Sequence, residues 1–336
     1  MDEARTAVPI PFDQYHPWQG AIDPERPLTP FQHRFVLSAF PRGARVVDAE
    51  PTRRYYGLGF PLRVRVVSPA GERLVLLRLD SFRGGIETEA ALLPVIARLG
   101  LPVPELLGGP ATDPERPGAG PMILISVVPG QDLLALGWNA SSADLDRYIA
   151  LVLEGIERLH GLTSAILADP VGSRLPCLSL AGELRAIAER GGPWMDEPVF
   201  RRAFERVWPL AEADPTAPAF SSGDYNPGNF LSDGHRLTGI VDFALSCFED
   251  PHIGLAKYWT YDWYPYNKAG LVERYLAQRG VSPEQFALRL AVRCLWTLQR
   301  GLPVAGHDNT RGHVQTFGAE RARLLELLGG ALTRLA

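Results

Sequence analysis

The order of the hydrophobic patterns places most of the expected strands before most of the expected helices. Apolar and polar side chains alternate in short segments of the first 125 residues, as in 62–66 and 73–79. Beyond residue 130, apolar residues recur at helical spacing, first over 142–160 and later over 283–335. A sheet-rich half followed by a helix-rich half favours an α+β fold with two lobes.

The boundary between the lobes is predicted at residues 126–130. The apolar run 122–128 has the length of a strand, and a Pro-Gly pair ends it sharply. We therefore assign residues 1–125 to an N-terminal arm and a sheet lobe. Residues 126–130 form a hinge, and residues 131–336 form the helical lobe.

Composition and charge exclude several classes of function. Hydrophobic residues make up 46% of the chain, enough for a substantial core, and the net charge of −4 leaves no basic face for nucleic acid. The sequence has no apolar run of about 18 residues, so we expect no membrane partner. The N-terminus lacks a basic segment followed by an apolar one, and the three cysteines lie far apart. A reduced, cytoplasmic location fits best.

The segment most informative about function combines three oxygen-bearing side chains with a tight turn. Asp224 and Asn229 lie on either side of a Pro-Gly pair, and Asp242 follows an apolar strand. Carboxylate and amide oxygens suit Mg²⁺, and a carboxylate can accept the proton of an attacking hydroxyl. Each of these residues alone is more often structural, as a turn residue or a strand-end cap. Their combination at this spacing indicates phosphoryl transfer.

The length of one hairpin loop decides whether Asp242 returns to Asn229. With a two-residue turn, the offset between them is about 13 Å, too far for one metal site. A four-residue loop, 233–236, pairs Asn229 with Ile240 and brings Asp242 to about 7–8 Å. We therefore predict the four-residue loop.

This segment resembles the signature of the aminoglycoside phosphotransferase family, which is itself similar to the protein-kinase fold. The family's usual signature is His-Gly-Asp-x-x-Pro-Gly-Asn, followed by an apolar strand that ends in Ile-Asp-Trp or Ile-Asp-Phe. This chain reads Ser-Gly-Asp-Tyr-Asn-Pro-Gly-Asn over 222–229 and Ile-Val-Asp-Phe over 240–243. It also matches the family's next motif at Asp-Pro, 250–251, and at Leu-Ala, 255–256.

The resemblance implies a two-lobed protein-kinase-like fold that binds a nucleotide between its lobes. ATP is the expected phosphoryl donor, with GTP as an alternative, and Mg²⁺ is the expected metal. By resemblance, Asp224 is the catalytic base, and Asn229 and Asp242 are the metal ligands. The expected acceptor is a hydroxyl group of a small molecule, such as an antibiotic, a sugar or an amino alcohol.

The resemblance also implies nucleotide contacts in the first lobe. Arg78 stands where the family has a phosphate-binding lysine, and Glu89 would pair with it. The backbone of the hinge, at Ser126 and Val128, would hold adenine. The glycine-containing turn at 57–62 is a weak candidate for a loop that covers the nucleotide.

Three positions depart from the family pattern. Arg78 replaces the lysine, and it could instead lie at a strand edge without a role. Ser222 replaces the family's His, and Gly254 replaces an Asp, so a hydrogen-bonding anchor beside the catalytic loop is expected to be missing. These departures leave open a non-catalytic nucleotide-binding module of the pseudokinase type. A protein kinase is less favoured, because no Ala-Pro-Glu segment follows Asp242.

The aromatic segment 258–266 has two interpretations. It is either packing between helices, which we favour slightly, or a wall of the acceptor site in which Asp262 meets an amine. A polycationic acceptor calls for several carboxylates, and few are visible beyond Glu249, Asp250 and Asp262. A typical aminoglycoside is therefore not the first choice of acceptor.

Overall fold

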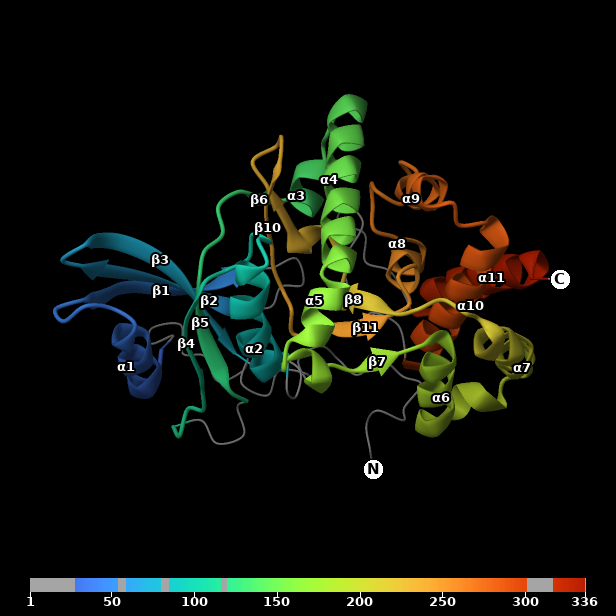
Figure 1. Ribbon diagram of the computed structural model, residues 1–336, viewed down its shortest axis with the longest axis horizontal. Coiled ribbons are helices and arrows are strands. Elements are labelled where there is room, and N and C mark those ends of the chain that lie inside the picture. The colour runs from blue at the N-terminus through green and yellow to red at the C-terminus, as the bar shows by residue number, and fades with distance from the viewer. Residues whose placement is uncertain (1–27, 54–58, 80–84, 116–119, 301–316, 336) are drawn as a thin grey trace.

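The chain forms a sheet-rich first part and a largely helical second part, joined near residue 126 (Figure 1). The computed structural model describes residues 28–53, 59–79, 85–115, 120–300 and 317–335. Residues 1–27 of the N-terminal arm, which the sequence predicts over 1–28, lie outside this range, as do residues 57 and 58 of the predicted nucleotide-covering turn. The two-lobed α+β architecture predicted from the sequence is confirmed.

The first lobe is a five-stranded antiparallel sheet with strand order β1-β2-β3-β5-β4. Its strands are β1 (Arg45–Arg53), β2 (Gly59–Ser68), β3 (Gly71–Leu79), β4 (Leu106–Ala111) and β5 (Met122–Ser126). The turn residues at 68–71, between two alternating segments, predict an antiparallel hairpin, and the pairing of β2 with β3 confirms it. The glycines and prolines of 108–121 predict a loop, and this prediction is wrong at its start, because β4 extends to Ala111. This strand lies at the sheet edge, where glycine and proline are tolerated.

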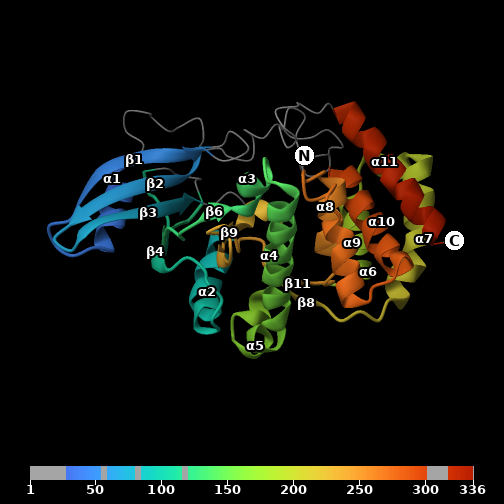
Figure 2. The ribbon, with the colours of Figure 1, turned by 90° about the horizontal axis from the view of Figure 1, so that it is seen from above.

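The two faces of this sheet pack against different partners. One face, which includes Leu62, Val64 and Val66, forms a small apolar cluster with helix α1 (Pro30–Ser38). The other face lies against helix α2 (Gly85–Arg98) and joins the main core of the protein (Figure 2). The apolar core therefore continues from the first lobe into the second through α2.

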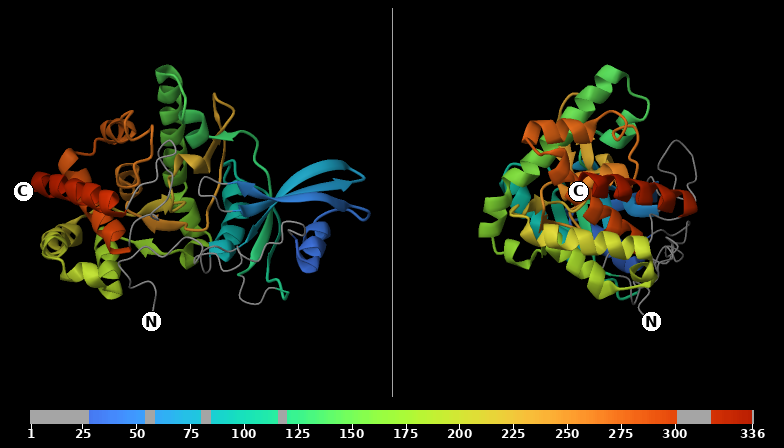
Figure 3. Two further views of the ribbon diagram at one scale, coloured as in Figure 1. Left: turned by 180° about the vertical axis from the view of Figure 1, so that it is seen from behind. Right: turned by 90° about the vertical axis from the view of Figure 1, so that its right-hand side faces the viewer.

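The helical lobe begins after the hinge, and its longest described helix starts at a serine cap. The sequence allows Ser141 or Ser142 as that cap, and the structure has Ser141. Figure 3 shows the helices gathered on the side of the molecule opposite the sheet. They are α3 (Leu133–Gly137), α4 (Ser142–Gly161), α5 (Thr163–Ala168), α6 (Leu180–Arg190), α7 (Pro198–Ala213), α8 (Lys257–Thr260), α9 (Leu271–Arg279), α10 (Pro283–Arg300) and α11 (Phe317–Arg334). Among the described residues, no helix is both long and apolar enough to cross a membrane.

The segment predicted as a hinge, 126–130, lies against a hairpin of the second lobe. That hairpin consists of β9 (Phe230–Ser232) and β10 (Leu237–Ile240), and the chain after the hinge pairs with β9 as β6 (Gln131–Asp132). Val128 packs so closely on Gly239 that an added Cβ there would lie 2.4 Å from Val128 Cγ1. The hairpin that carries part of the candidate site is thus fixed to the junction between the lobes.

Candidate active site

The predicted catalytic loop, residues 222–229, begins where strand β8 (Ala219–Ser221) ends. Gly223 turns the chain there with a φ of +79°, and a Cβ at this position would lie 2.0 Å from Leu245 O. Only glycine fits such a turn without moving the neighbouring backbone. The turn leads to Asp224, whose side chain is 29% exposed and therefore accessible to a substrate.

One turn of 3₁₀ helix, η6 (Pro227–Asn229), returns the chain to Asp224. Asn226 stabilises this turn, because its Oδ1 accepts a hydrogen bond from Gly228 N at 2.8 Å. Asn229 Nδ2 donates to the backbone oxygen of Asp224 at 3.1 Å and lies 3.4 Å from its Oδ2. Since the amide nitrogen faces Asp224, the amide oxygen is directed to the other side of the planar group.

The hairpin between Asn229 and Asp242 has the predicted four-residue loop, 233–236. Asp233 organises this loop, since its Oδ1 accepts the backbone N–H groups of both His235 and Arg236 at 3.0 Å. These hydrogen bonds lower the pKa of the Asp233 carboxyl to about 2. The side chain thus stabilises the longer loop instead of a two-residue Asp-Gly turn.

The predicted pairing of Asn229 with Ile240 is wrong by one residue. A bulge in β10 shifts the register, so that Ile240 pairs with Phe230. The residue opposite Asn229 is Val241, whose N–H donates to Asn229 O at 2.9 Å. Asp242 is the residue after Val241, which lies opposite Asn229. The two predicted metal ligands, Asn229 and Asp242, are therefore one position apart along the paired strands.

Arg78 of β3 connects the first lobe to Asp242. Its Nη2 donates to Asp242 Oδ1 at 2.8 Å, and its Nε lies 3.1 Å from Oε2 of Glu89 in α2. The residue is 9% exposed and Glu89 is fully buried. The alternative that Arg78 lies idle at a strand edge is therefore wrong, while its predicted contact with phosphate stays a prediction.

Asp242 also has an unusual backbone conformation. Its φ is +69°, in the left-handed region that residues with a side chain seldom adopt. Such conformations persist where the surroundings impose them, and they cluster at functional sites.

The predicted adenine-binding residues lie at the junction of the lobes. Ser126 N donates to Glu105 O at 2.9 Å, and Ser126 Oγ accepts from Glu105 N at 2.8 Å. The N–H group of Ser126 is thus already engaged within the sheet. Val128 is half-buried with its side chain against β10, and a contact of its backbone with adenine stays a prediction.

Lys257, at the start of α8, is a site residue that the sequence analysis did not single out. Its Nζ donates to Gly223 O and lies 3.3 Å from Asp224 Oδ1. The residue is 8% exposed. The one sequence feature that could have drawn attention to Lys257 is the scarcity of lysine, since Lys257 and Lys268 are the only lysines among 34 basic residues.

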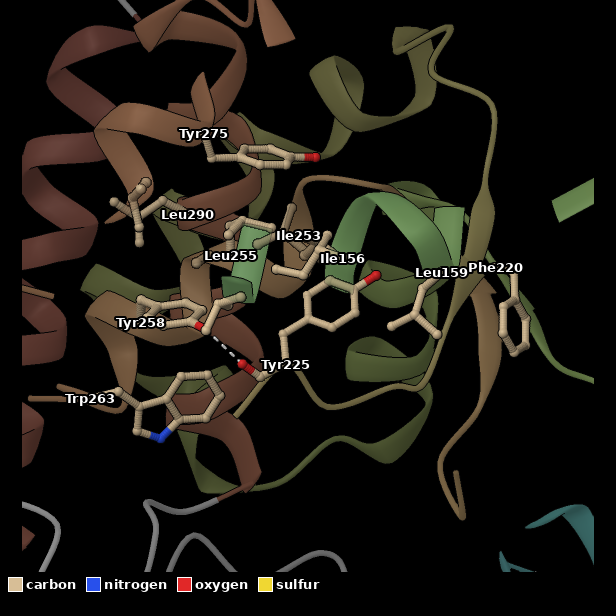
Figure 4. Packing of buried hydrophobic residues seen from close by; sticks show 14 of the residues in the cluster. Ile156, Leu159, Phe220, Tyr225, Ile253, Leu255, Tyr258, Trp263, Tyr275 and Leu290 are labelled. Atoms are coloured by element: carbon tan, nitrogen blue, oxygen red, sulfur yellow. Dashed lines mark hydrogen bonds between the residues drawn. The ribbon is translucent and has the colours of Figure 1, made fainter. Parts of the chain in front are cut away.

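The expectation that Gly254 leaves the catalytic loop without an anchor is corrected by the structure. Tyr225 occupies the space beside Gly254, where an added Cβ would lie 2.5 Å from the ring carbon Cδ2. Tyr258 Oη donates to Tyr225 O at 2.8 Å, the bond drawn in Figure 4. Together with Lys257, Tyr258 holds the loop from α8.

His160 supports the same loop from α4, as a buried residue. Its Nε2 lies 2.9 Å from the hydroxyl of Tyr225. Burial lowers the pKa of His160 to about 3, with a smaller effect from the positive charge of Arg279. In the unfolded chain this side chain becomes protonated near pH 6.5. The free energy of unfolding therefore falls as the pH decreases from about 6.5 towards about 3.

We expect His160→Gln to reduce the acid sensitivity of the fold. In the wild type, protonation of the unfolded state at His160 costs about 2 kcal/mol of stability between pH 7 and pH 5. Glutamine can bond the Tyr225 hydroxyl but does not titrate. Urea unfolding at pH 7, 6 and 5 measures the effect. Equal losses of unfolding free energy in the wild type and the variant would contradict this assignment.

The aromatic segment 258–266 is largely packing, as we slightly favoured. Tyr258, Trp263 and Tyr266 are buried in the main core. Asp262 is hydrogen-bonded to Asn267 and lines a cavity of about 500 Å³ between the segment after α8 and helices α10 and α11. None of the contacts described for Asp262 reaches Asp224.

Two carboxylates considered for a cationic acceptor are engaged inside the protein. Glu249 accepts a hydrogen bond from the Ser221 hydroxyl and is 7% exposed. Asp250 is 3% exposed, and its Oδ2 accepts from Arg289 Nη2 at 2.8 Å. Both residues therefore support the catalytic-loop region and are not presented to a ligand.

The oxygen atoms of Asn229 and Asp242 fit a hard cation. Among the described residues, no group of three His, Cys, Asp or Glu side chains could hold a metal without other ligands. Mg²⁺ in phosphoryl-transfer sites usually has one or two protein carboxylates or amides and is completed by phosphate oxygens and water. The pair present here agrees with that donor set.

The sheet lobe, the fixed junction and the loop that carries Asp224 define the class of protein-kinase-like folds. The chain belongs to the phosphotransferase enzyme family, whose model matches residues 60–291. No curated protein sequence matches the chain.

Solved structures of aminoglycoside phosphotransferases have the same fold. APH(4)-Ia matches with a TM-score of 0.61 and 18% identity, over 90% of this chain and 98% of its own. A thermostable mutant of APH(4)-Ia with ADP and hygromycin B matches with a TM-score of 0.62 and 16% identity, over 90% and 98%. APH(2")-IIIa with GDP and kanamycin matches with a TM-score of 0.54 and 17% identity, over 90% and 96%.

Proposed function

We propose that this protein transfers the γ-phosphoryl group of ATP, with Mg²⁺, to a hydroxyl group of a small molecule. The observation that carries the proposal is the meeting of two lobes at one polar cluster. Arg78 of the first lobe binds Asp242, and the hairpin from Asp242 leads back to Asn229 and Asp224. Membership of the phosphotransferase family supports the same activity.

In this proposal, residues 1–125 contain the nucleotide-binding lobe, residues 126–130 are the hinge, and residues 131–336 carry the acceptor site. Ser126 and Val128 mark the adenine end of the nucleotide site. Arg78, held by Glu89, contacts the α- and β-phosphates. The charge of a guanidinium and its several N–H donors suit that contact.

Asp224 is the proposed base. Its carboxylate accepts the proton of the acceptor hydroxyl while the hydroxyl oxygen forms a bond to the γ-phosphorus. The bond from that phosphorus to the β,γ-bridging oxygen breaks, and ADP carries away the bonding electrons. Asn229 and Asp242 would hold Mg²⁺, which neutralises phosphate charge when bound.

The acceptor is proposed to be neutral or to carry few positive charges. Glu249 and Asp250 are engaged with Ser221 and Arg289, so they offer little to a polycation. Hydroxylated antibiotics, sugars and amino alcohols remain the candidate acceptors. The donor is ATP in this proposal, and GTP is the alternative to compare.

The test is ADP or GDP formation with a panel of such alcohols, followed by ³¹P NMR of the product. We expect acceptor-dependent ADP formation that EDTA abolishes and that yields a phosphate monoester. If no acceptor in the panel raises the rate of ADP formation above the rate without acceptor, the proposal is contradicted. A product phosphorylated at nitrogen would also contradict it.

A second candidate is a nucleotide-binding module without catalysis. The observation that favours it is that both predicted functional carboxylates are paired, Asp242 with Arg78 and Asp224 with Lys257. A thermal-shift titration distinguishes the two candidates. Stabilisation by ATP, with no phosphate ester formed from any acceptor in a broad panel, would favour the binding module.

A further inference from the structure

We propose that Lys257 positions the catalytic base Asp224 for phosphoryl transfer. The proposal rests on the proposed function. It assigns a role to a residue that the family signature in this sequence does not include. The ammonium group bridges the backbone of the catalytic loop and the side chain of the base, through Gly223 O and Asp224 Oδ1.

Within the described part of the chain, the Asp224 carboxylate has contacts from two different elements. Lys257 of α8 lies 3.3 Å from Oδ1, and the amide of Asn229 lies 3.4 Å from Oδ2. Two donors on the two oxygens restrict rotation of the carboxylate plane. A base held in one plane keeps the geometry needed to take a proton from the acceptor, and a misplacement of about 1 Å can cost about 100-fold in rate.

The positive charge of Lys257 has an effect on Asp224 that a neutral hydrogen-bond donor would not have. Tyr258, the next residue, already ties α8 to the catalytic loop through Tyr225 O. Lys257 adds a buried positive charge, and such a charge is retained only when it is paired. Here the partner is the carboxylate that must approach an anionic triphosphate, so the ammonium reduces their mutual repulsion.

Asp242, the other carboxylate predicted to act in the site, also lies beside a cation. Arg78 lies on Asp242, and Lys257 lies on Asp224. Arg78 also contacts Glu89, so each carboxylate of the cluster has a cation beside it before any nucleotide is present. Loss of Lys257 would therefore affect the chemical step at Asp224 and leave the nucleotide contacts at Arg78 in place.

The kinetic test compares Lys257→Met and Lys257→Arg with the matched control Lys268→Met. Lys268 is the other lysine of the chain, and it is exposed. We expect Lys257→Met to lower kcat about 100-fold, with the KM for ATP within about threefold of wild type. Lys257→Arg should regain part of kcat, and Lys268→Met should resemble wild type. An unchanged kcat in a folded Lys257→Met variant would overturn the proposal.

A second measurement needs no turnover. In protein labelled with ¹³C at the lysine ε-carbon, the two lysines give two side-chain signals, and Lys268→Met leaves the signal of Lys257. We expect Asp224→Asn to shift this signal and the exposed-site substitution Asp146→Asn to leave it in place. A Lys257 signal whose chemical shift is unchanged in Asp224→Asn would overturn the proposed contact, even if Lys257→Met fails to fold. Absence of phosphate transfer in the wild type would instead refute the proposed function.

Discussion

Asp224→Asn is expected to lower the rate of phosphoryl transfer by about 10²–10⁴-fold while the protein stays folded. Asparagine has nearly the same shape as aspartate, and its amide oxygen can still accept the hydrogen bond from Lys257. The amide cannot take the proton of the acceptor hydroxyl. Steady-state kinetics with the identified acceptor measures the loss of kcat, and thermal unfolding checks the fold.

The matched control for this prediction is Asp146→Asn. Asp146 is an exposed aspartate whose partner, Arg274, is also on the surface, so its removal should leave kcat and the melting temperature near their wild-type values. ATP affinity should survive in Asp224→Asn, because the proposed phosphate contact lies at Arg78. If Asp224→Asn keeps at least half of the wild-type kcat, Asp224 is not the base.

Arg78→Met is expected to destabilise the protein by about 3–5 kcal/mol and to weaken ATP binding. The stability effect follows from burial. Glu89 is fully buried against Arg78, and removal of the guanidinium leaves its carboxylate without that partner. Chemical denaturation measures the free energy of unfolding, and calorimetric titration measures ATP affinity.

A double variant separates the two effects of Arg78. Arg78→Met combined with Glu89→Gln removes both charges of the buried pair, so most of the lost unfolding free energy should return. ATP affinity should stay low, because the cation proposed to meet phosphate is still absent. A double variant that recovers both stability and ATP affinity would show that Arg78 is structural only.

The division into lobes was predictable because it depends on local patterns. Alternation in β2 and β3, and helical spacing in α4, are properties of neighbouring residues that tertiary contacts did not override. Strand β4 was missed because its two glycines and proline are typical of turns. It is a strand because it pairs with the apolar strand β5.

The candidate site was predictable where its geometry is set within one hairpin. The loop 233–236 followed from the need to bring Asp242 near Asn229. The register was wrong by one residue because of a bulge beside Thr238, whose hydroxyl donates to Pro129 O at 2.6 Å. That partner is 109 residues away in sequence, so hairpin geometry alone could not reveal the contact.

The role of Lys257 could not be read from the sequence because its contacts arise only in the folded chain. It is separated from Asp224 by 33 residues, and the connection runs through the β9–β10 hairpin and strand β11 (Cys247–Glu249). The replacement of an Asp by Gly254 suggested a missing anchor. The structure shows instead that the ring of Tyr225 fills that space and that α8 holds the loop.

The most direct test of the central claim is a crystal structure with a non-hydrolysable ATP analogue and Mn²⁺ in place of Mg²⁺. Anomalous scattering locates Mn²⁺ directly. We predict a metal peak bonded to Asn229 Oδ1 and an Asp242 oxygen, with the terminal phosphate facing Asp224. A metal bound elsewhere, or a triphosphate whose terminal phosphate points away from Asp224, would contradict the proposed site.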